Sequence, residues 1–199
     1  MRWELHDAGK HPIPPNTTCR QNTPAWRARR ALANLQLLRQ LTPPRVCAAA
    51  LSTLWNRWCT HRRYQKRHCQ SNVCLLGCGG TAEDSIEHYF SCTVTKDTLL
   101  RQLNLPPHLF ANLHSGLLCN ANIQTTDQLT AIALLIYGLY NTTNHLRHNP
   151  GTPATQITDM LAQHIREGAK HHPQATGVLD SRWNRDRQSR PLPPIPYTI

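Results

Sequence analysis

One stretch of the chain decides the fold that the sequence predicts. It reads CLLGCGGTAEDSIEHYFSC and runs from Cys74 to Cys92, with cysteine and histidine in the pattern C-x3-C-x9-H-x3-C. Gly77 precedes Cys78, and two further glycines follow it. Glycine adopts positive φ without strain, so this loop can turn tightly and point both sulfurs inward.

The second half of the stretch carries helix signals. His88 and Cys92 are four residues apart, which places two side chains on one face of a helix. Asp84 is the expected N-cap, and Glu87 stands three residues later, as in a capping box. Three thiolates and one imidazole make a closed structural zinc shell with no position left for a water. The predicted zinc ligands are Cys74, Cys78, His88 and Cys92.

Other assignments of these side chains stay open. His68 and Cys69 are alternative ligands, although they lie in a basic stretch without the glycine turn. The cysteines of the stretch also fit unrelated buried thiols, since cysteine packs well in cores. Three more cysteines have no near partner of ligand spacing, and we expect them to be core or boundary thiols. They are Cys47, Cys59 and Cys119.

The residues around the stretch carry a further pattern. It consists of LWNRWCT at 54–60, RRYQ at 62–65, the two cysteines, EDSIEHYF at 83–90, and Cys92. Together they resemble the zinc-binding segment that follows the reverse-transcriptase domain of non-LTR retrotransposons. The sequence has no polymerase motif of the Tyr-x-Asp-Asp kind, so the resemblance implies a tail of such a protein without its polymerase activity. It further implies retroelement RNA or target DNA as the partner.

Charge also favours a nucleic-acid partner. The chain of 199 residues has 22 Lys and Arg against 11 Asp and Glu, a formal net charge of +11. Such a surface attracts polyanions, and the charge clusters beside the zinc stretch. Arginine binds phosphates through two parallel hydrogen bonds, and an aromatic ring stacks on bases. The alternative is a solvated helix C-terminus, where cations are also favourable. The predicted nucleic-acid contacts are Arg62, Arg63, Tyr64, Lys66 and Arg67.

Cysteine usage and hydropathy bear on the compartment. Eight cysteines fit a disulfide framework, but the N-terminal residues lack the apolar region of a secretory signal. The longest apolar run, residues 129–140, is too short to span a bilayer. We therefore expect an intracellular protein, nuclear or cytoplasmic, that is not secreted and has no membrane partner. In a reducing compartment Cys/His clusters indicate metal sites.

Apolar spacing predicts an all-α fold, a small helical bundle with one zinc-knuckle turn. Residues 24–41 form a helix with Leu32 on its apolar face and Asn34 opposite, and a second helix runs to about Thr60. The most apolar helix is capped by Thr126, lies centrally and loses helix preference at 141–143; another helix covers 155–170. The expected divisions are an arm at 1–22, two helices and a basic stretch at 23–68, the knuckle at 69–93, helices at 94–170 and a disordered Pro/Arg-rich tail at 171–199.

The tail contains a candidate protein-binding motif. Residues 190–196 read RPLPPIP, which fits R-x-x-P-x-x-P. Proline pre-orders a polyproline II helix that SH3-type aromatic grooves bind. The residues that would contact such a partner are Arg190, Pro193 and Pro196.

These observations predict a zinc-binding, nucleic-acid-binding accessory region of a retroelement reverse-transcriptase-like protein, as a fragment lacking polymerase motifs. One alternative is a protein-interaction module with a purely structural zinc site and a proline-rich tail. Another is a decayed element fragment without a function. The closed metal shell and the lack of G-x-S-x-G, phosphate-loop and deaminase motifs argue against an enzyme.

Overall fold

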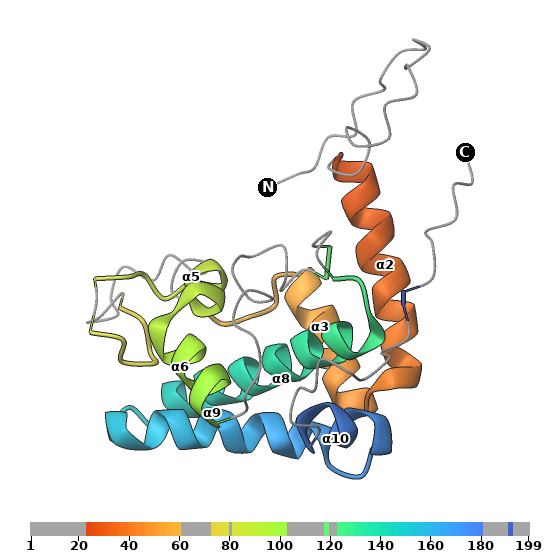
Figure 1. Ribbon diagram of the computed structural model, residues 1–199. Helices are drawn as coiled ribbons and strands as arrows, with labels where there is room; N and C mark the ends of the chain where they lie inside the picture. The colour runs from red at the N-terminus through yellow and green to blue at the C-terminus, as the bar shows by residue number, and fades with distance from the viewer. Residues whose placement is uncertain are drawn as a thin grey trace.

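The computed structural model describes residues 23–60, 73–79, 81–102, 118–119, 123–180 and 191–192. These residues contain seven helices and two isolated β-bridges, Val73 with Glu83 and Thr125 with Pro191, but no strand. The all-α prediction is confirmed. The helices are α2 (Pro24–Leu41), α3 (Pro44–Leu54), α5 (Ile86–Ser91), α6 (Thr93–Gln102), α8 (Thr126–His148), α9 (Ala154–Ala169) and α10 (Pro173–Asp180), drawn in Figure 1.

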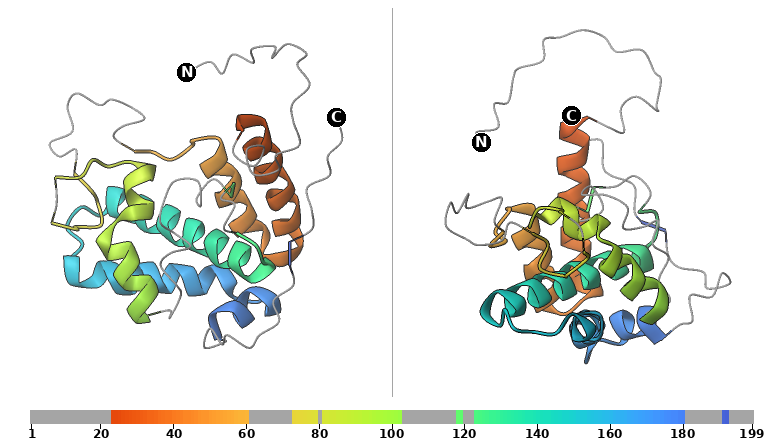
Figure 2. Two further views of the ribbon diagram at one scale, coloured as in Figure 1. Left: turned by 45° about the horizontal axis from the view of Figure 1, so that its top comes forward. Right: turned by 90° about the vertical axis from the view of Figure 1, so that its left-hand side faces the viewer.

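Helix α8 is the centre of the bundle, as its apolar composition predicts. It contacts α2, α3, α9 and α10, and its middle residues 131–136 are fully buried. Its N-cap is Thr125 rather than the predicted Thr126, and Thr125 and Gln128 form a reciprocal capping box. Figure 2 shows α8 and α9 side by side in both views.

Helix α8 is longer than its sequence predicts, because it continues through residues 141–143 to His148. The polar side chains there bond to the helix itself. Asn141 Nδ2 donates to the Tyr137 carbonyl at 2.8 Å, and Thr143 Oγ1 donates to the Leu139 carbonyl at 2.8 Å. These bonds satisfy buried polar groups that would otherwise favour a break.

Helix α2 matches its predicted apolar face in part, because Ala31 and Leu38 are buried as expected while Leu32 and Asn34 exchange places. Leu32 is 59% exposed, whereas Asn34 is only 3% exposed. Asn34 Nδ2 donates to the Leu118 carbonyl at 2.7 Å, and Arg30 donates to the Ile123 carbonyl at 2.7 Å. Two polar side chains thus pack inward by satisfying the Leu118 and Ile123 carbonyls, which hydrophobic spacing alone does not predict.

One helix end and one whole helix also differ from the prediction. Helix α3 stops at Leu54 rather than near Thr60. Helix α10 lies inside 171–199, where the sequence pattern predicts no order, and its Ala175 and Val178 are buried in the core. Helix α9 matches its predicted bounds to within one residue. Among the helices described, none is long and apolar enough to cross a membrane.

Candidate metal centre

Four side chains meet at one point between the 73–83 loop and helices α5 and α6. Cys74 Sγ lies 3.9 Å from Cys92 Sγ, and Cys78 Sγ lies 3.5 Å from His88 Nε2. All four ligand atoms lie within 4.8 Å of one another. Cys74 and Cys92 are buried, while Cys78 and His88 are half-buried. The arrangement can hold a metal ion, and it brings together the four predicted ligands.

The cysteines of this centre are not joined by a disulfide. All three are free thiols. A disulfide bond would bring two sulfurs to about 2.05 Å, whereas Cys74 Sγ and Cys92 Sγ stand 3.9 Å apart. The sulfurs are therefore available as ligands.

The loop owes its shape to glycine and to backbone bonds. Gly77 has φ +68° and Gly79 has φ +73°, the left-handed region that glycine adopts freely, as the sequence predicts. Gly77 N–H donates to the Cys74 carbonyl at 3.2 Å, which closes the turn between the first two ligands. Cys74 N–H donates to the Ala82 carbonyl at 2.8 Å and ties the two ends of the loop together.

Helix α5 presents His88, but its cap is not the predicted residue. Ser85 is the N-cap, and its Oγ accepts from His88 N–H at 3.2 Å. The predicted cap Asp84 precedes it, and Glu87 therefore does not stand at the capping-box position. The bond from Ser85 fixes the backbone of the ligand residue itself.

Cys92 ends α5 and caps α6. Its carbonyl accepts from Lys96 N–H at 3.0 Å, and α6 starts at the next residue, Thr93. The Cys74 and Cys92 thiols share a hydrogen bond, which lowers the pKa of Cys92. Burial raises that pKa, while the backbone N–H groups of Thr95 and Val94 and the nearby His88 lower it. The same bond and burial raise the pKa of Cys74. A thiolate at a helix N-terminus is stabilised by the exposed amides, which favours a metal ligand.

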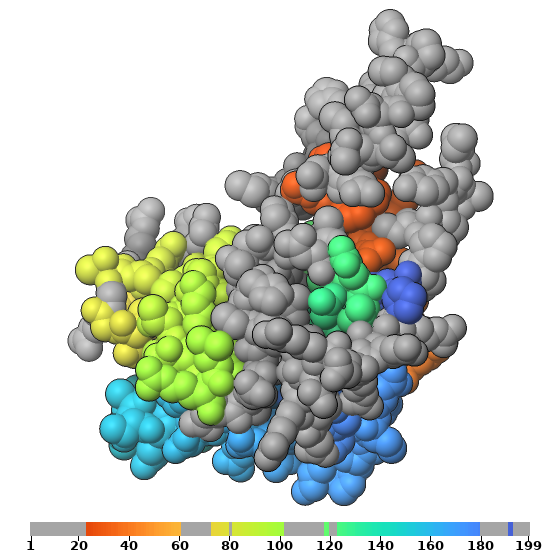
Figure 3. Space-filling view, in the orientation of Figure 1, coloured from red at the N-terminus to blue at the C-terminus, as the bar shows by residue number. Residues whose placement is uncertain are grey.

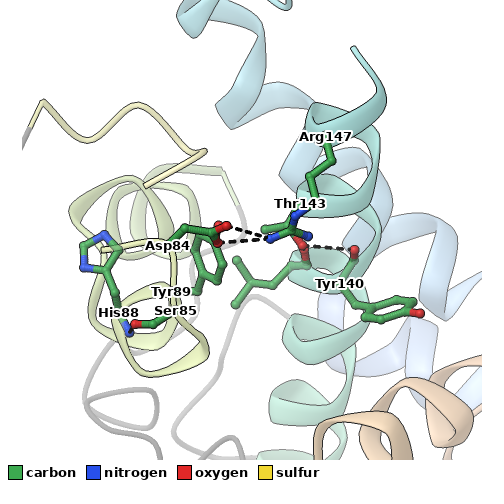
Figure 4. A network of polar contacts seen from close by, with 8 residues as sticks. Asp84, Ser85, His88, Tyr89, Tyr140, Thr143 and Arg147 are labelled. Carbon is green, nitrogen blue, oxygen red and sulfur yellow. Dashed lines mark hydrogen bonds and ion pairs between the residues drawn. The ribbon is translucent and has the colours of Figure 1, made fainter. Parts of the chain in front are cut away.

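Asp84 links this centre to the bundle. Arg147 Nη2 donates to both carboxylate oxygens of Asp84, at 3.0 and 3.2 Å, and the Tyr89 hydroxyl donates to the same carboxylate (Figure 4). Burial raises the pKa of Tyr89, and the neighbouring Asp84 charge raises it further. Arg147 lies in the part of α8 beyond the predicted helix end, so sequence spacing gave no sign of this pair.

Aromatic packing makes the centre part of the main core. Tyr89 and Phe90 are fully buried. The Trp58 ring lies 6.2 Å from that of Tyr89 and 5.6 Å from that of Tyr140 in α8. Figure 3 shows the residues 73–102 seated beside α9, which α6 contacts.

The remaining predicted site residues lie outside the described part of the chain. This applies to the alternative ligands, to the nucleic-acid contacts and to the SH3-type contacts of the tail. They are His68, Cys69, Arg62, Arg63, Tyr64, Lys66, Arg67, Arg190, Pro193 and Pro196. Within the proline-rich segment the structure describes Pro191 and Leu192, and Leu192 N–H donates to the Gln124 carbonyl at 2.8 Å.

Comparison of the chain with protein-family models, with curated proteins and with solved structures finds no match.

Proposed function

We propose that this chain is a zinc-binding, nucleic-acid-binding accessory region of a retroelement reverse-transcriptase-like protein. The observation that supports it most strongly is the convergence of three cysteines and one histidine, from a loop, helix α5 and the junction of α5 and α6, on one point. The retroelement origin rests on the motifs at 54–65 and 83–92.

Zinc is the metal that fits this centre best. Bonds of about 2.3 Å to sulfur and about 2.0 Å to nitrogen in a tetrahedron separate two sulfurs by about 3.8 Å and a sulfur from a nitrogen by about 3.5 Å. The corresponding separations here are 3.9 Å for Cys74 and Cys92 and 3.5 Å for Cys78 and His88. Thiolate and imidazole ligands suit zinc better than the hard cations Mg²⁺ and Ca²⁺.

The proposed zinc site is structural. Four protein ligands fill a tetrahedral shell, so no coordination position remains for a water or a substrate. The ion would join the 73–83 loop to the start of α6, and Asp84 and Arg147 would join both to α8. The site therefore stabilises a surface rather than performing a reaction.

The charge distribution supports a polyanionic partner. Residues 8–82 contain no Asp or Glu, so the sequence that leads up to the metal ligands carries an excess of cations. The predicted contact segment 62–67 lies between Thr60, which is buried, and Val73, which precedes the first ligand. A run of one charge sign attracts phosphates over a distance of about 8 Å at physiological salt. The cations of residues 8–82 are Lys10, Arg20, Arg27, Arg29, Arg30, Arg39, Arg45, Arg57, Arg62, Arg63, Lys66 and Arg67.

A salt titration of RNA and DNA binding tests the proposal. Neutralising phosphates releases counterions, so log K should fall linearly with log salt, by about 0.7 to 0.9 per phosphate contact. A variant with glutamine at Arg62, Arg63, Lys66 and Arg67 should have a slope smaller by about 3.

The matched control replaces Lys96 and Arg101 in α6 with glutamine, and it should leave most of the slope intact. Binding that does not depend on salt, or no binding to either polymer, would contradict the proposal.

A further inference from the structure

The turn that ends α3 is rigid and is built around a left-handed residue. Asn56 has φ +50°. Its N–H donates to the Thr53 carbonyl at 3.0 Å, and Arg57 N–H donates to the Ser52 carbonyl at 2.8 Å. This pair of bonds is the Schellman arrangement, which satisfies the last carbonyls of a helix. The backbone of residues 55–57 is thus held in one conformation.

The two tryptophans of this turn differ in exposure. Trp58 is 1% exposed, and its Nε1 donates to Thr53 Oγ1 at 2.9 Å. Trp55, three residues earlier, is 63% exposed. Burying a tryptophan removes a large apolar area from water and is strongly favourable. Trp58 is buried and holds the turn against the core, while the Trp55 indole stays exposed on the same turn. We read this exposed indole as a contact surface.

Arg57 accompanies the exposed indole. Its guanidinium carbon lies 6.0 Å from the Trp55 ring centroid, and Arg57 is itself exposed. Both residues belong to the stretch 8–82, which contains no carboxylate side chain. A cation next to an aromatic face suits a partner that offers both a flat ring and a phosphate.

We propose that Trp55 and Arg57 form a stacking site for single-stranded nucleic acid. The Trp55 indole stacks on an unpaired base, and Arg57 contacts the adjoining phosphate. In a duplex the base faces are covered by neighbouring bases, so a side chain reaches them only where the strand is unpaired. The inference rests on the proposed function and adds to it the residues and the strandedness of the nucleic acid.

The rigid turn makes the site effective. Ordering a flexible loop on binding costs conformational entropy, which subtracts from affinity. The bonds of Asn56 and Arg57 N–H and the burial of Trp58 order this turn before any partner arrives. In the sequence, Arg57 precedes the predicted basic segment 62–67 by five residues.

The test measures binding of the full chain to a labelled single strand of about 15 nucleotides and to the matching duplex, as DNA and as RNA, by fluorescence anisotropy. Trp55→Ala should weaken binding to the single strand by about 5- to 100-fold and binding to the duplex by much less. Trp55→Phe should retain most of the affinity, whereas Trp55→Leu should not, because leucine lacks a stacking face. Leu32→Ala removes another exposed apolar side chain of the same acid-free stretch and should leave affinity unchanged.

The outcomes separate this inference from the proposed function. Salt-dependent binding by the parent together with unchanged single-strand affinity in Trp55→Ala would overturn the stacking site and leave the charge-based function standing. Equal losses for single strand and duplex would also overturn it. No binding of any nucleic acid by the parent would overturn both. A different result for DNA and RNA, with the Trp55→Ala loss present in one of them, would support the site and identify its strand.

Discussion

Asp84 is the residue through which the bundle holds the metal centre. Its side chain is 7% exposed, and its carboxylate accepts from Arg147 of α8 and from the Tyr89 hydroxyl of α5. A buried charge is tolerated only where it is paired and hydrogen-bonded. Two N–H bonds and one O–H bond meet that need, so a single carboxylate connects the loop, the short helix and the central helix.

Removing one partner of this pair should therefore be costly. Arg147→Met leaves the Asp84 charge buried without its cation, and we expect a loss of about 3 kcal/mol in the free energy of unfolding. The measurement is chemical denaturation at a fixed zinc concentration. Arg101→Met removes an exposed arginine of α6 and should change stability by less than about 0.5 kcal/mol.

The double variant Asp84→Asn/Arg147→Met provides the second comparison for this pair. It removes both charges and should recover part of the loss, because no unpaired charge remains. Equal stability of Arg147→Met and the parent would show that the pair does not hold the loop.

His164 should make stability depend on pH. Its Nδ1 lies 2.9 Å from Thr142 Oγ1, and burial lowers its pKa; nearby His145 lowers it further, while Glu167 raises it. A lowered folded-state pKa means that the unfolded chain takes up a proton first as pH falls. The stabilisation is complete above the ordinary value of about 6.5 and is lost below it.

The free energy of unfolding of the parent should accordingly fall more than that of His164→Gln between about pH 7.5 and about pH 5.5. Denaturation of both proteins in excess zinc measures the two declines, and both chains keep the same metal ligands. If the free energy of unfolding falls equally in the parent and in His164→Gln, His164 does not cause the pH dependence.

At the residue scale the sequence predicts the four metal ligands but not the side chains that hold them in place. The Cys/His spacing is local and reflects a loop and a helical turn, so Cys74, Cys78, His88 and Cys92 are recognisable without tertiary information. Arg147 lies 63 residues from Asp84, and only folding brings the two together. The cap is Ser85 rather than Asp84, and the sequence does not separate the two because both residue types cap helices well.

At the scale of elements, the packing of α8 on α9 is unusually close. A Cβ at Gly138 would overlap the Ile165 side chain, and a Cβ at Gly168 would stand 2.7 Å from the Tyr137 ring. Neither glycine has positive φ, so space rather than conformation requires it. Each helix places its glycine against a large side chain of the other.

Gly138→Ala should destabilise the protein by about 1 to 3 kcal/mol, because the β-branched Ile165 side chain has little room to move. The sign of this change is informative, because helix propensity alone would make the alanine variant more stable than the glycine parent by about 1 kcal/mol. Thermal unfolding measures the effect. Gly151→Ala, which places its Cβ in open space, is the control and should be close to neutral. A stabilised Gly138→Ala variant would contradict the close packing.

Hydrophobic periodicity predicts the helices well and their ends poorly. The central position of α8 follows from its composition, which is apolar nearly all round. Its extension past Asn141 and the inward face of Asn34 depend on hydrogen bonds to specific carbonyls, which periodicity does not report. Helix α10 forms because Ala175 and Val178 find a place in the core, a tertiary effect on a short segment.

At the scale of the whole molecule, the metal centre and the bundle share one core. Cys74, Cys92, Tyr89 and Phe90 belong to the same buried cluster as Trp58 and the fully buried residues of α8. Loss of the ion should thus weaken the molecule as a unit rather than loosen one loop, because cooperative cores unfold together.

Chelation of the metal should lower the melting temperature of the full chain by about 10 °C in a single transition. Far-UV circular dichroism follows the helices, and tryptophan fluorescence follows all five tryptophans, including the buried Trp58, whose ring lies near Tyr89. The two curves should coincide. An unchanged melting temperature, or a fluorescence change well before the loss of helix, would contradict the single core.

The measurement that tests the central claim most directly is the metal content of the purified chain by native mass spectrometry. We predict about one zinc ion per chain, because the four ligands complete a single tetrahedral shell. The Cys78→Ser/Cys92→Ser variant should lose the ion, whereas a Cys47→Ser/Cys59→Ser variant, which changes thiols outside the cluster, should keep it. A parent chain without zinc, or a variant that binds zinc without Cys78 and Cys92, would contradict the account.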